Sequence, residues 1–361
     1  MRELNTLLTQ PTAWLKPNIG DDRIIVSSRV RLARNLANKI FPDWMSEDDA
    51  VTLLEEIAPK ILAMSEFEEA IFLNMKELTK IDKDFLIERH LISHDLKRKT
   101  KGSGIIINTD ETVSIMINEE DHLRLQAIST GQKVEELWKK MDKIDSAIEQ
   151  QLPYAFSENY GYLTSCPTNL GTGMRVSVMM HLPGLVLMNE ISPIMKAVNK
   201  IGLAVRGLWG EGTEAAGNMF QISNQCSLGE SESSILKQLI EISEEIATQE
   251  KNARMRLLEQ KANYIRDHIY RAYGILMNAY MLSSKETLDM LSAVWLGLDL
   301  QLIKNVSETD IKELFIFTQP GHLQKILGRA ISTEKRDIVR ARMVKNKLDK
   351  SGKHNRIGLE D

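Results

Sequence analysis

Residues 163–175 read LTSCPTNLGTGMR and run directly into an alternating stretch, MRVSVM, at 174–179. One of only two cysteines, Cys166, stands here before a proline and a turn-forming run with two glycines. Glycine lets backbone N–H groups approach an anion without interference from a Cβ atom, and Arg175 adds a fixed positive charge at the start of the strand. The stretch therefore has the layout of a reactive site. The alternative is a buried structural cysteine before an ordinary loop.

The bulk composition is that of a soluble globular protein. The chain has 361 residues, 43% hydrophobic and 27% charged, with a net charge of -4 at pH 7. It is long enough for a large core and two domains. The balance of charge does not indicate direct nucleic-acid binding, although residues 319–361 are locally basic. Because we find no disulfide framework, no secretory signal and no membrane-spanning apolar run, we expect a cytoplasmic protein without membrane contact.

A β-branched strand is predicted over residues 23–34, and it carries two arginines. Arg29 and Arg31 lie two positions apart, so an extended chain points both at one face. Their guanidinium groups repel each other unless an anion lies between them. A solvated polar face is the alternative for this strand alone. Three more arginines, Arg124, Arg175 and Arg206, stand at the ends of other predicted strands, and a polyanion such as ATP with Mg²⁺ would satisfy all five.

Periodicity and capping signals predict the other elements. The part before residue 229 is expected to hold helices at 46–64, 82–97 and 133–150, a hairpin at 104–117, and strands at 203–207 and 218–224. The part after it reads as long helices, with one or two over 231–280 and capping boxes that open further helices at 283 and 307.

Two groups of polar residues in the first half have competing interpretations. His90 and His94, four residues apart, could share a helix face, but no Cys, Asp or Glu completes a zinc site. One of them could lie against a nucleotide base, or both could be plain surface histidines. Residues 118–125 hold three acids, a histidine and Arg124 at a predicted sheet-to-helix junction. An acidic helix N-terminus is the alternative there, and Arg124 fits it poorly.

Phosphoryl transfer accounts for the arginines most economically. The chain lacks a Walker A motif and the His-Arg-Asp and Asp-Phe-Gly motifs of eukaryotic-type protein kinases, so another kinase architecture is needed. Carboxylates at Glu120 and Glu211, with the thiolate of Cys166, would suit a planar cation as acceptor, because two carboxylates can grip a guanidinium. The glycine-rich composition around Glu211 is that of a loop that can close over a ligand.

Four motifs carry a family resemblance: SSRVR at 27–31, NEEDHLR at 118–124, CPTNLGTGMR at 166–175 and RGLWGE at 206–211. In this order they resemble the catalytic domain of the phosphagen (guanidino) kinases. The resemblance implies an α+β fold with a curved antiparallel sheet flanked by helices, and ATP with Mg²⁺ as cofactors. It implies Glu120, Glu211 and Cys166 as catalytic residues and no metal ligand in the protein. The nucleotide-binding residues it implies are Ser27, Ser28, Arg29, Val30, Arg31, His90, Arg124, Arg175, Val176, Ser177, Val178, Met179, Arg206, Gly207, Leu208, Trp209, Gly210 and Glu211.

Within that group the chain resembles the bacterial protein-arginine kinases. Small-molecule phosphagen kinases carry a helical domain before the catalytic one, whereas here a lead-in at 1–20 precedes a catalytic domain at 21–253, and an all-helical domain follows at 254–361. The sequence RDIVRA at 336–341 resembles that family's phosphoarginine-binding motif and implies an allosteric site at Arg336, Asp337, Arg340 and Ala341. From spacing alone, a salt-bridged helix face is the alternative.

The resemblance also implies a function and partners. The expected activity is ATP-dependent phosphorylation of arginine in proteins, which marks them for Clp-type degradation and regulates the heat-shock response. The expected partners are proteins with exposed arginines, a zinc-binding activator, a Clp ATPase, a heat-shock repressor and further copies of the chain in a homodimer or higher oligomer. A free-arginine kinase and a non-catalytic phosphoarginine-binding adaptor are the alternatives.

Overall fold

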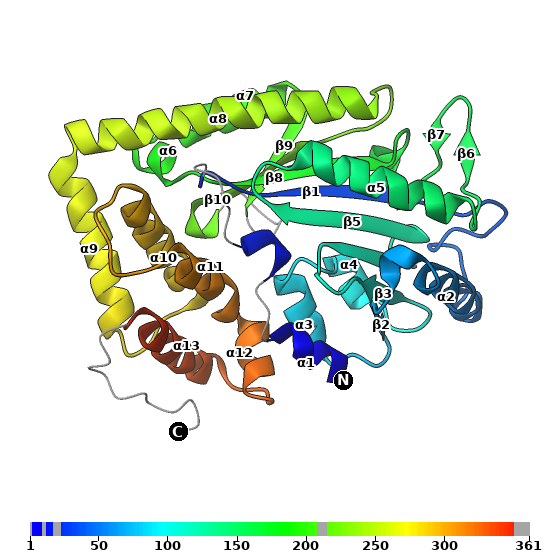
Figure 1. Cartoon of the computed structure of the whole chain (residues 1–361), viewed down its shortest axis with the longest axis horizontal. Helices are drawn as coiled ribbons and strands as arrows, with labels where there is room; N and C mark the ends of the chain where they lie inside the picture. The colour runs from blue at the N-terminus through cyan, green and yellow to red at the C-terminus, as the bar shows by residue number, and fades with distance from the viewer. Residues whose placement is uncertain (1, 9–11, 17–22, 208–214, 350–361) are drawn as a thin grey trace.

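An eight-stranded sheet forms the centre of the computed structural model, which describes residues 2–8, 12–16, 23–207 and 215–349 (Figure 1). Its strand order is β2-β3-β4-β5-β1-β8-β10-β9, and every neighbouring pair is antiparallel. The strands are β1 Ile25–Arg34, β2 Ile71–Asn74, β3 Gly104–Ile107, β4 Val113–Ile117, β5 Leu123–Thr130, β8 Met174–His181, β9 Leu203–Gly207 and β10 Met219–Asn224. β6 Phe156–Ser157 and β7 Gly161–Tyr162 form a separate hairpin. The predicted α+β fold with an antiparallel sheet is confirmed.

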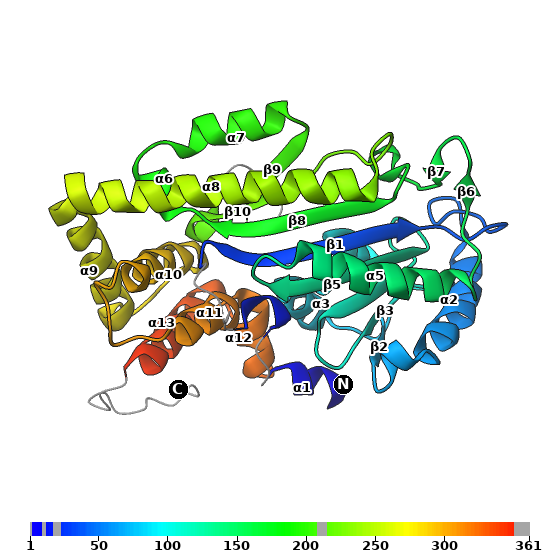
Figure 2. The ribbon, with the colours of Figure 1, turned by 45° about the horizontal axis from the view of Figure 1, so that its top comes forward.

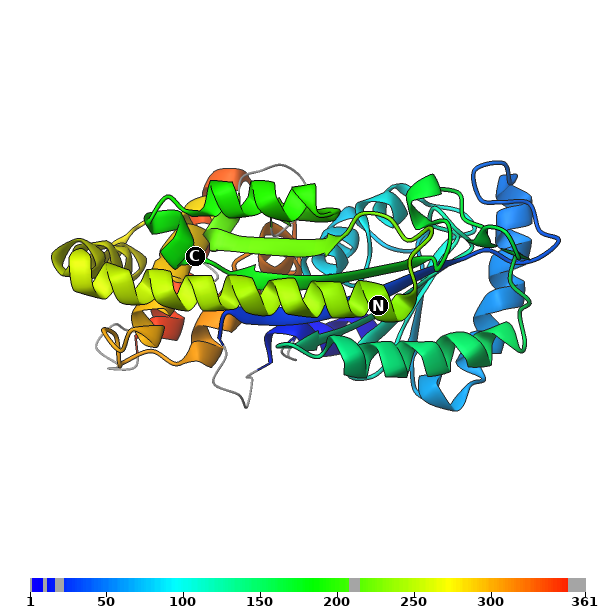
Figure 3. The same cartoon turned by 90° about the horizontal axis from the view of Figure 1, so that it is seen from above.

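Three helices cover one face of this sheet. Seen from above, α8 (Glu232–Gln260) runs along the sheet beside α5 (Val134–Glu149), and α2 (Glu47–Leu62) lies toward one end (Figure 3). Their apolar stripes share one core with inward-facing strand residues such as Val30 and Leu32. Because side chains alternate along a strand, this burial turns Arg29 and Arg31 to the opposite face.

The remaining helices of the first part are short. They are α1 Arg2–Leu8, α3 Lys80–Glu88, α4 His94–Arg98, α6 Pro183–Leu187 and α7 Ile191–Lys200, with 3-10 turns η1 Ala13–Leu15, η2 Ser65–Phe67, η3 Pro167–Asn169 and η4 Ala216–Asn218. The predicted helices at 46–64 and 133–150 and the hairpin at 104–117 are confirmed. Ser46 caps α2 by accepting a hydrogen bond from the backbone N–H of Asp49 at 3.2 Å.

Helices α9 to α13 form a cluster at one end of the sheet (Figures 1 and 2). They are α9 Ala262–Asn278, α10 Ser284–Asp299, α11 Glu308–Phe317, α12 Pro320–Ile326 and α13 Thr333–Leu348, and they enclose a second core around Trp295. The predicted caps are present, since Ser283 accepts from Glu286 N at 3.2 Å and Ser307 from Asp310 N at 3.1 Å. α8 continues without interruption through residues 253 and 254.

The helical cluster is fixed to the sheet region by buried polar contacts. Glu88 at the end of α3 accepts hydrogen bonds from the backbone N–H groups of Gly321 and His322 at 2.6 and 2.8 Å. Arg254 joins Glu250 at 2.6 Å and Asp299 at 2.8 Å. None of the helices in the described parts of the chain is long and apolar enough to span a membrane.

Two predicted elements are wrong. The helix predicted at 82–97 ends at Glu88, because His90 adopts a left-handed conformation with φ of 59° and Ser93 then caps a new helix through Leu96 N at 3.0 Å. His90 and His94 therefore do not share a helix face. The sheet-to-helix junction predicted at 118–125 is a tight turn into strand β5, closed by a bond from Asn118 N to His122 O at 2.9 Å.

Candidate active site

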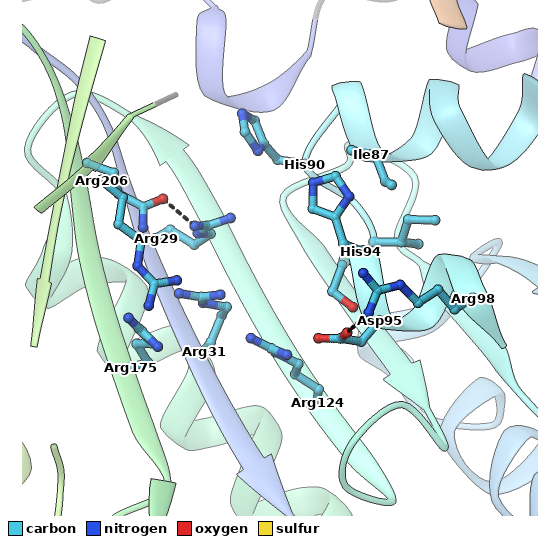
Figure 4. A pocket seen from close by; sticks show the side chains of 13 residues that line it. Arg29, Arg31, Ile87, His90, His94, Asp95, Arg98, Arg124, Arg175 and Arg206 are labelled. Atoms are coloured by element: carbon cyan, nitrogen blue, oxygen red, sulfur yellow. Dashed lines mark hydrogen bonds and ion pairs between the residues drawn. The ribbon is translucent and has the colours of Figure 1, made fainter. Parts of the chain in front are cut away.

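Five arginines from four strands converge on one pocket of about 300 Å³ (Figure 4). Arg29 and Arg31 come from β1, and the others are Arg124 from β5, Arg175 from β8 and Arg206 from β9. Arg31 lies directly opposite Arg175 in the β1–β8 pairing. The structure brings the five predicted arginines together in one pocket, and Arg29 and Arg31 lie well inside β1 and not at its end.

This cluster of cations is electrostatically strained. Burial, followed by repulsion from Arg124 and Arg175, lowers the pKa of Arg29 to about 9. Burial, followed by repulsion from Arg29, Arg124 and Arg175, lowers the pKa of Arg31 well below its ordinary value. The Nε atoms of Arg31 and Arg175 are buried and have no acceptor among the described residues. Buried donors without acceptors are costly, so the pocket fits a ligand with many anionic oxygens.

Arg124 has a counter-ion among the described residues. Its guanidinium donates to both carboxylate oxygens of Glu119, at 2.6 and 2.9 Å, and Glu119 is itself buried. Burial would lower the pKa of Arg124, but the carboxylates of Glu119, Glu120 and Asp121 outweigh it and raise that pKa. Ser93 also donates to Glu119. The local sequence does not predict a role for Glu119, because nothing in the pattern of residues 118–125 indicates which acid contacts Arg124.

The opposite wall of the pocket comes from the end of α3, the segment that follows it, and α4. Ile87, His90, Ile92, Ser93, His94, Asp95 and Arg98 line it. The His90 ring meets the Trp14 ring edge-on, with centroids 4.6 Å apart. Burial, and then Arg29 and Arg31, lower the pKa of His90 to about 3, so its imidazole is neutral at neutral pH. A neutral ring on this wall suits the predicted position beside a nucleotide base.

Glu120 and Cys166 are the described residues that we predict to bind the guanidinium of the phosphoryl acceptor. They lie together next to the arginines. Glu120 lines a small cavity with Arg31, Arg124 and Arg175. Burial, followed by the neighbouring charges of Asp121 and Glu119, raises the pKa of Glu120, while Arg124 and a hydrogen bond from the Cys166 thiol lower it less. A carboxylate with a raised pKa is a better base than an ordinary one. Glu211, the other predicted acid, lies outside the described residues, as do Leu208, Trp209 and Gly210.

Asn35 and Asp121 hold the acceptor loops together, and the sequence did not single them out. The Oδ1 atom of Asp121 accepts from Asn35 Nδ2 at 2.6 Å and from Ser165 N at 2.7 Å, immediately before Cys166. The Oδ1 atom of Asn35 accepts from His122 N at 2.8 Å. The end of β1, the β4–β5 turn and the Cys166 loop are therefore joined by one buried network.

The other predicted nucleotide ligands divide between the two faces of the sheet. Ser27, Ser177 and Met179 line a small recess beside Arg29 and His90. Val30, Val176 and Val178 pack in the core on the opposite face, and Ser28 donates to Gly131 O at 2.7 Å. Gly207 is buried at the end of β9. Any contact of the three valines with a nucleotide would therefore have to come from the backbone.

The predicted phosphoarginine motif lies on α13, and its two arginines have different surroundings. Arg340 is 1% exposed and donates to Thr318 O and Leu282 O, both at 2.7 Å, and to Asp337 at 2.5 Å. Arg336 is half-buried and donates to Ile331 O and Thr333 Oγ1 at 2.9 Å. Ala341 is buried in the helical core. Arg340 thus holds the helical cluster together whatever else it binds.

The described residues contain no group of three or more His, Cys, Asp or Glu side chains that could hold a metal ion. The arginine pocket is lined mainly by cations and neutral side chains, together with the acid Asp95.

Comparisons with known proteins agree with this geometry. Residues 53–253 match the family model of the ATP:guanido phosphotransferase C-terminal catalytic domain, and residues 262–357 match that of the protein-arginine kinase McsB C-terminal domain. The curated protein-arginine kinase of Brevibacillus brevis is 44% identical, over 93% of this chain and 94% of that protein. That of Bacillus subtilis is 42% identical, over 93% of each.

Solved structures of phosphagen kinases share the fold. The duplicated taurocyamine kinase from Schistosoma mansoni with bound transition state analog components has a TM-score of 0.58 and 29% identity, over 68% of this chain and 35% of that one. Lombricine kinase has a TM-score of 0.57 and 24% identity, over 68% of this chain and 70% of that one. Taken with the curated relatives, these matches show that the chain belongs to the protein-arginine kinase family and is a phosphotransferase with a guanidino nitrogen as acceptor.

Proposed function

We propose that this protein transfers the terminal phosphoryl group of ATP to arginine side chains of other proteins. The observation that carries the proposal is the position of Glu120 and Cys166 beside a pocket with five converging arginines. The arginines supply the charge that a triphosphate needs, and the acid and thiol lie where a guanidinium would enter. The names of the curated relatives support a protein-bound arginine as the acceptor.

The chemical problem is that arginine is a poor nucleophile. Its guanidinium has a pKa above ~12 and must lose a proton before a nitrogen can attack phosphorus. In our proposal Glu120 and Glu211 clamp the guanidinium, one of them takes the proton, and Cys166 orients the group. The arginine cluster holds the charge on the moving phosphoryl group, with Arg124 fixed in place by Glu119. Mg²⁺, when present with ATP, would neutralise further charge there.

The adaptor alternative explains less of this site. A phosphoarginine-binding adaptor needs cations for the phosphate, but it has no use for a partly buried carboxylate whose pKa is raised beside a thiol. A free-arginine kinase would use the same catalytic groups. Only its choice of acceptor would differ, so the acceptor has to be tested directly.

We also propose a cellular role, which rests on the family resemblance. Phosphoarginine would mark proteins for a Clp-type protease in the cytoplasm, and a heat-shock repressor would be one target. A zinc-binding activator, a Clp ATPase and further copies of the chain in a homodimer or higher oligomer are the proposed partners.

Incubation of the purified protein with ATP, Mg²⁺ and an arginine-rich unfolded protein tests the activity. We expect acid-labile phosphate on arginine residues of that protein, located by mass spectrometry under neutral conditions. Phosphorylation of free arginine alone would favour the free-arginine kinase. If ATP binds but no acceptor is phosphorylated even with the proposed activator present, the adaptor is favoured.

The α13 motif gives a separate prediction. Arg336→Ala is expected to weaken binding of phosphoarginine outside the catalytic site by about 1.5 to 3 kcal/mol, the typical contribution of a charge-assisted hydrogen bond. Titration of protein with a blocked Cys166 measures it. Arg340→Ala is a poor test, because it also leaves the carbonyls of Thr318 and Leu282 without their donor. Lys335→Ala, an exposed change on the same helix, is the control, and equal effects of Arg336→Ala and Lys335→Ala would refute the assignment.

A further inference from the structure

Four large apolar side chains are exposed at one end of the sheet, on two segments of the chain. They are Ile40 at 58%, Trp44 at 86%, Phe156 at 57% and Tyr160 at 56% exposed, and we call them the apolar rim. Ile40 and Trp44 lie between β1 and α2, while Phe156 and Tyr160 belong to the β6–β7 hairpin. Large apolar side chains gathered on a surface indicate an interaction site.

Backbone contacts fix the two segments to each other. Leu36 and Tyr154 form an antiparallel bridge. On either side of it, Ala37 N donates to Pro153 O at 2.8 Å, and Ala155 N donates to Asn35 O at 2.7 Å. In Figures 1 and 2 both segments project from the same end of the sheet, beside α2. The apolar rim is therefore one surface on a shared base.

The same segments are bonded to the loops that hold the predicted acceptor residues. The carbonyl oxygen of Ile40 lies 2.8 Å from Nε2 of His122, two residues after Glu120. On the hairpin side, Tyr162 N donates to Gly171 O at 2.8 Å, in the loop that follows Cys166. The apolar rim is thus joined to both acceptor loops, whereas the nucleotide wall with His90 comes from other strands and helices.

When the acceptor arginine belongs to a substrate polypeptide, the residues that flank it in the sequence lie near this surface. An extended chain advances about 3.3 Å per residue, so residues three positions away lie about 10 Å from the arginine. The rim also carries acidic charge, since Asp43 and Glu158 are exposed and neither is paired with another described residue. Such a surface favours a segment that is cationic at its centre and apolar at its flanks.

We infer that the apolar rim binds large apolar residues that flank the acceptor arginine in an extended, unfolded segment of a substrate protein. This inference rests on the proposed function. Folded proteins bury most of their large apolar side chains, so a site that requires them beside an arginine selects unfolded proteins. The kinase itself would then select unfolded proteins as substrates, before a protease binds the phosphoarginine.

Two peptides of equal length test the inference. Each has one arginine, flanked three positions away on both sides by phenylalanine in one peptide and by serine in the other. We expect the wild type to phosphorylate the apolar peptide with about tenfold higher kcat/KM, mainly through a lower KM, as partial burial of two aromatic side chains predicts. Trp44→Ser with Tyr160→Ser should bring this ratio close to one and leave kcat on the serine peptide unchanged.

A matched control uses exposed apolar residues of the helical cluster and α8. Tyr264 and Met255 are 53% and 59% exposed, so Tyr264→Ser with Met255→Ser removes similar surface elsewhere. The tenfold ratio should survive in that control. If the rim double variant fails to fold, Trp44→Ser alone replaces it, with a reduced ratio as the expected result.

The outcomes separate the inference from the proposed function. If the wild type phosphorylates neither peptide, the proposed function fails. Equal rates on both peptides, or a ratio that persists in the rim variant, overturn the inference alone. A lower mass of the rim variant in solution, with the ratio unchanged, would show that the rim joins two copies of the chain and would also overturn it.

Discussion

Glu120→Gln is expected to lower kcat for arginine phosphorylation about 10²–10⁴-fold, the range that a general base contributes. The amide keeps the size and the hydrogen-bonding oxygen of Glu120, but it cannot accept a proton from the guanidinium. The affinity for ATP should stay nearly unchanged, because Glu120 is not among the residues that line the arginine pocket, where we propose that the nucleotide binds. Steady-state kinetics and a nucleotide titration measure the two quantities. If both fall together, Glu120 supports the nucleotide site and is not the base.

The pH dependence of the rate gives an independent check of the same residue. Burial, then Asp121 and Glu119, raise the pKa of Glu120 above its ordinary value of 4.5. A base acts only when ionised, so activity should rise with pH through a pKa above 4.5. Asp121→Asn removes one of these charges but keeps the oxygen that accepts from Asn35 and Ser165, so the acid limb should move to lower pH. If the acidic side of the pH–rate profile is unchanged in Asp121→Asn, the rate is controlled there by a group other than Glu120.

The face of the sheet on which Arg29 and Arg31 lie could be predicted from the local sequence pattern, because the alternation of side chains along a strand determines it. Residues two apart on a strand point the same way, and the apolar Val30 between Arg29 and Arg31 must face a core. This fixes the side of the sheet on which the cations lie. The pattern also predicted the long helices, since their apolar periodicity and their caps at Ser46, Ser283 and Ser307 are local signals.

The segment 80–130 could not be predicted in the same way. The helical pattern there continues past Glu88, and only the left-handed backbone of His90 and the cap at Ser93 break it. β5 was missed because the acids of residues 118–122 resemble a helix start, whereas the turn is held by long-range bonds to Asn35. Such bonds connect residues more than 80 positions apart, and a local pattern carries no information about them.

In the candidate active site, too, some residues could be predicted from local sequence and others could not. Arginines, acids and Cys166 were recognised by residue type and motif. The residues that hold these groups in place could not be predicted. Three acids are adjacent at 119–121, and only the tertiary structure determines that Glu119 binds Arg124. Asn35 is a single polar residue after a strand, and its local sequence does not indicate its bonds to Asp121 and His122. The different surroundings of Arg336 and Arg340 also depend on tertiary packing, since Arg340 binds carbonyls of two other segments.

The largest expected effect on stability comes from a buried ion pair next to His90, on the wall of the arginine pocket that lies opposite the arginines. Arg89 donates to both carboxylate oxygens of Glu111, at 2.9 and 2.5 Å, and the side chains are 0% and 2% exposed. Glu111→Ala is expected to reduce the free energy of unfolding by about 3 to 5 kcal/mol, because it removes the carboxylate from a buried, bidentate ion pair. Chemical denaturation measures this loss.

Asp267→Ala is the matched control, since the Asp267–Arg271 pair is 65% and 69% exposed and should contribute less than about 1 kcal/mol. A similar small loss for Glu111→Ala would show that water or another group compensates Arg89. The position of the pair adds a functional consequence. Arg89 directly precedes His90, which lines the arginine pocket where we propose that ATP binds, so Glu111→Ala should also weaken ATP binding in protein that is still folded. Unchanged ATP affinity would mean that Trp14 and the hydrogen bond from Gln126 to His90 O are enough to hold that wall.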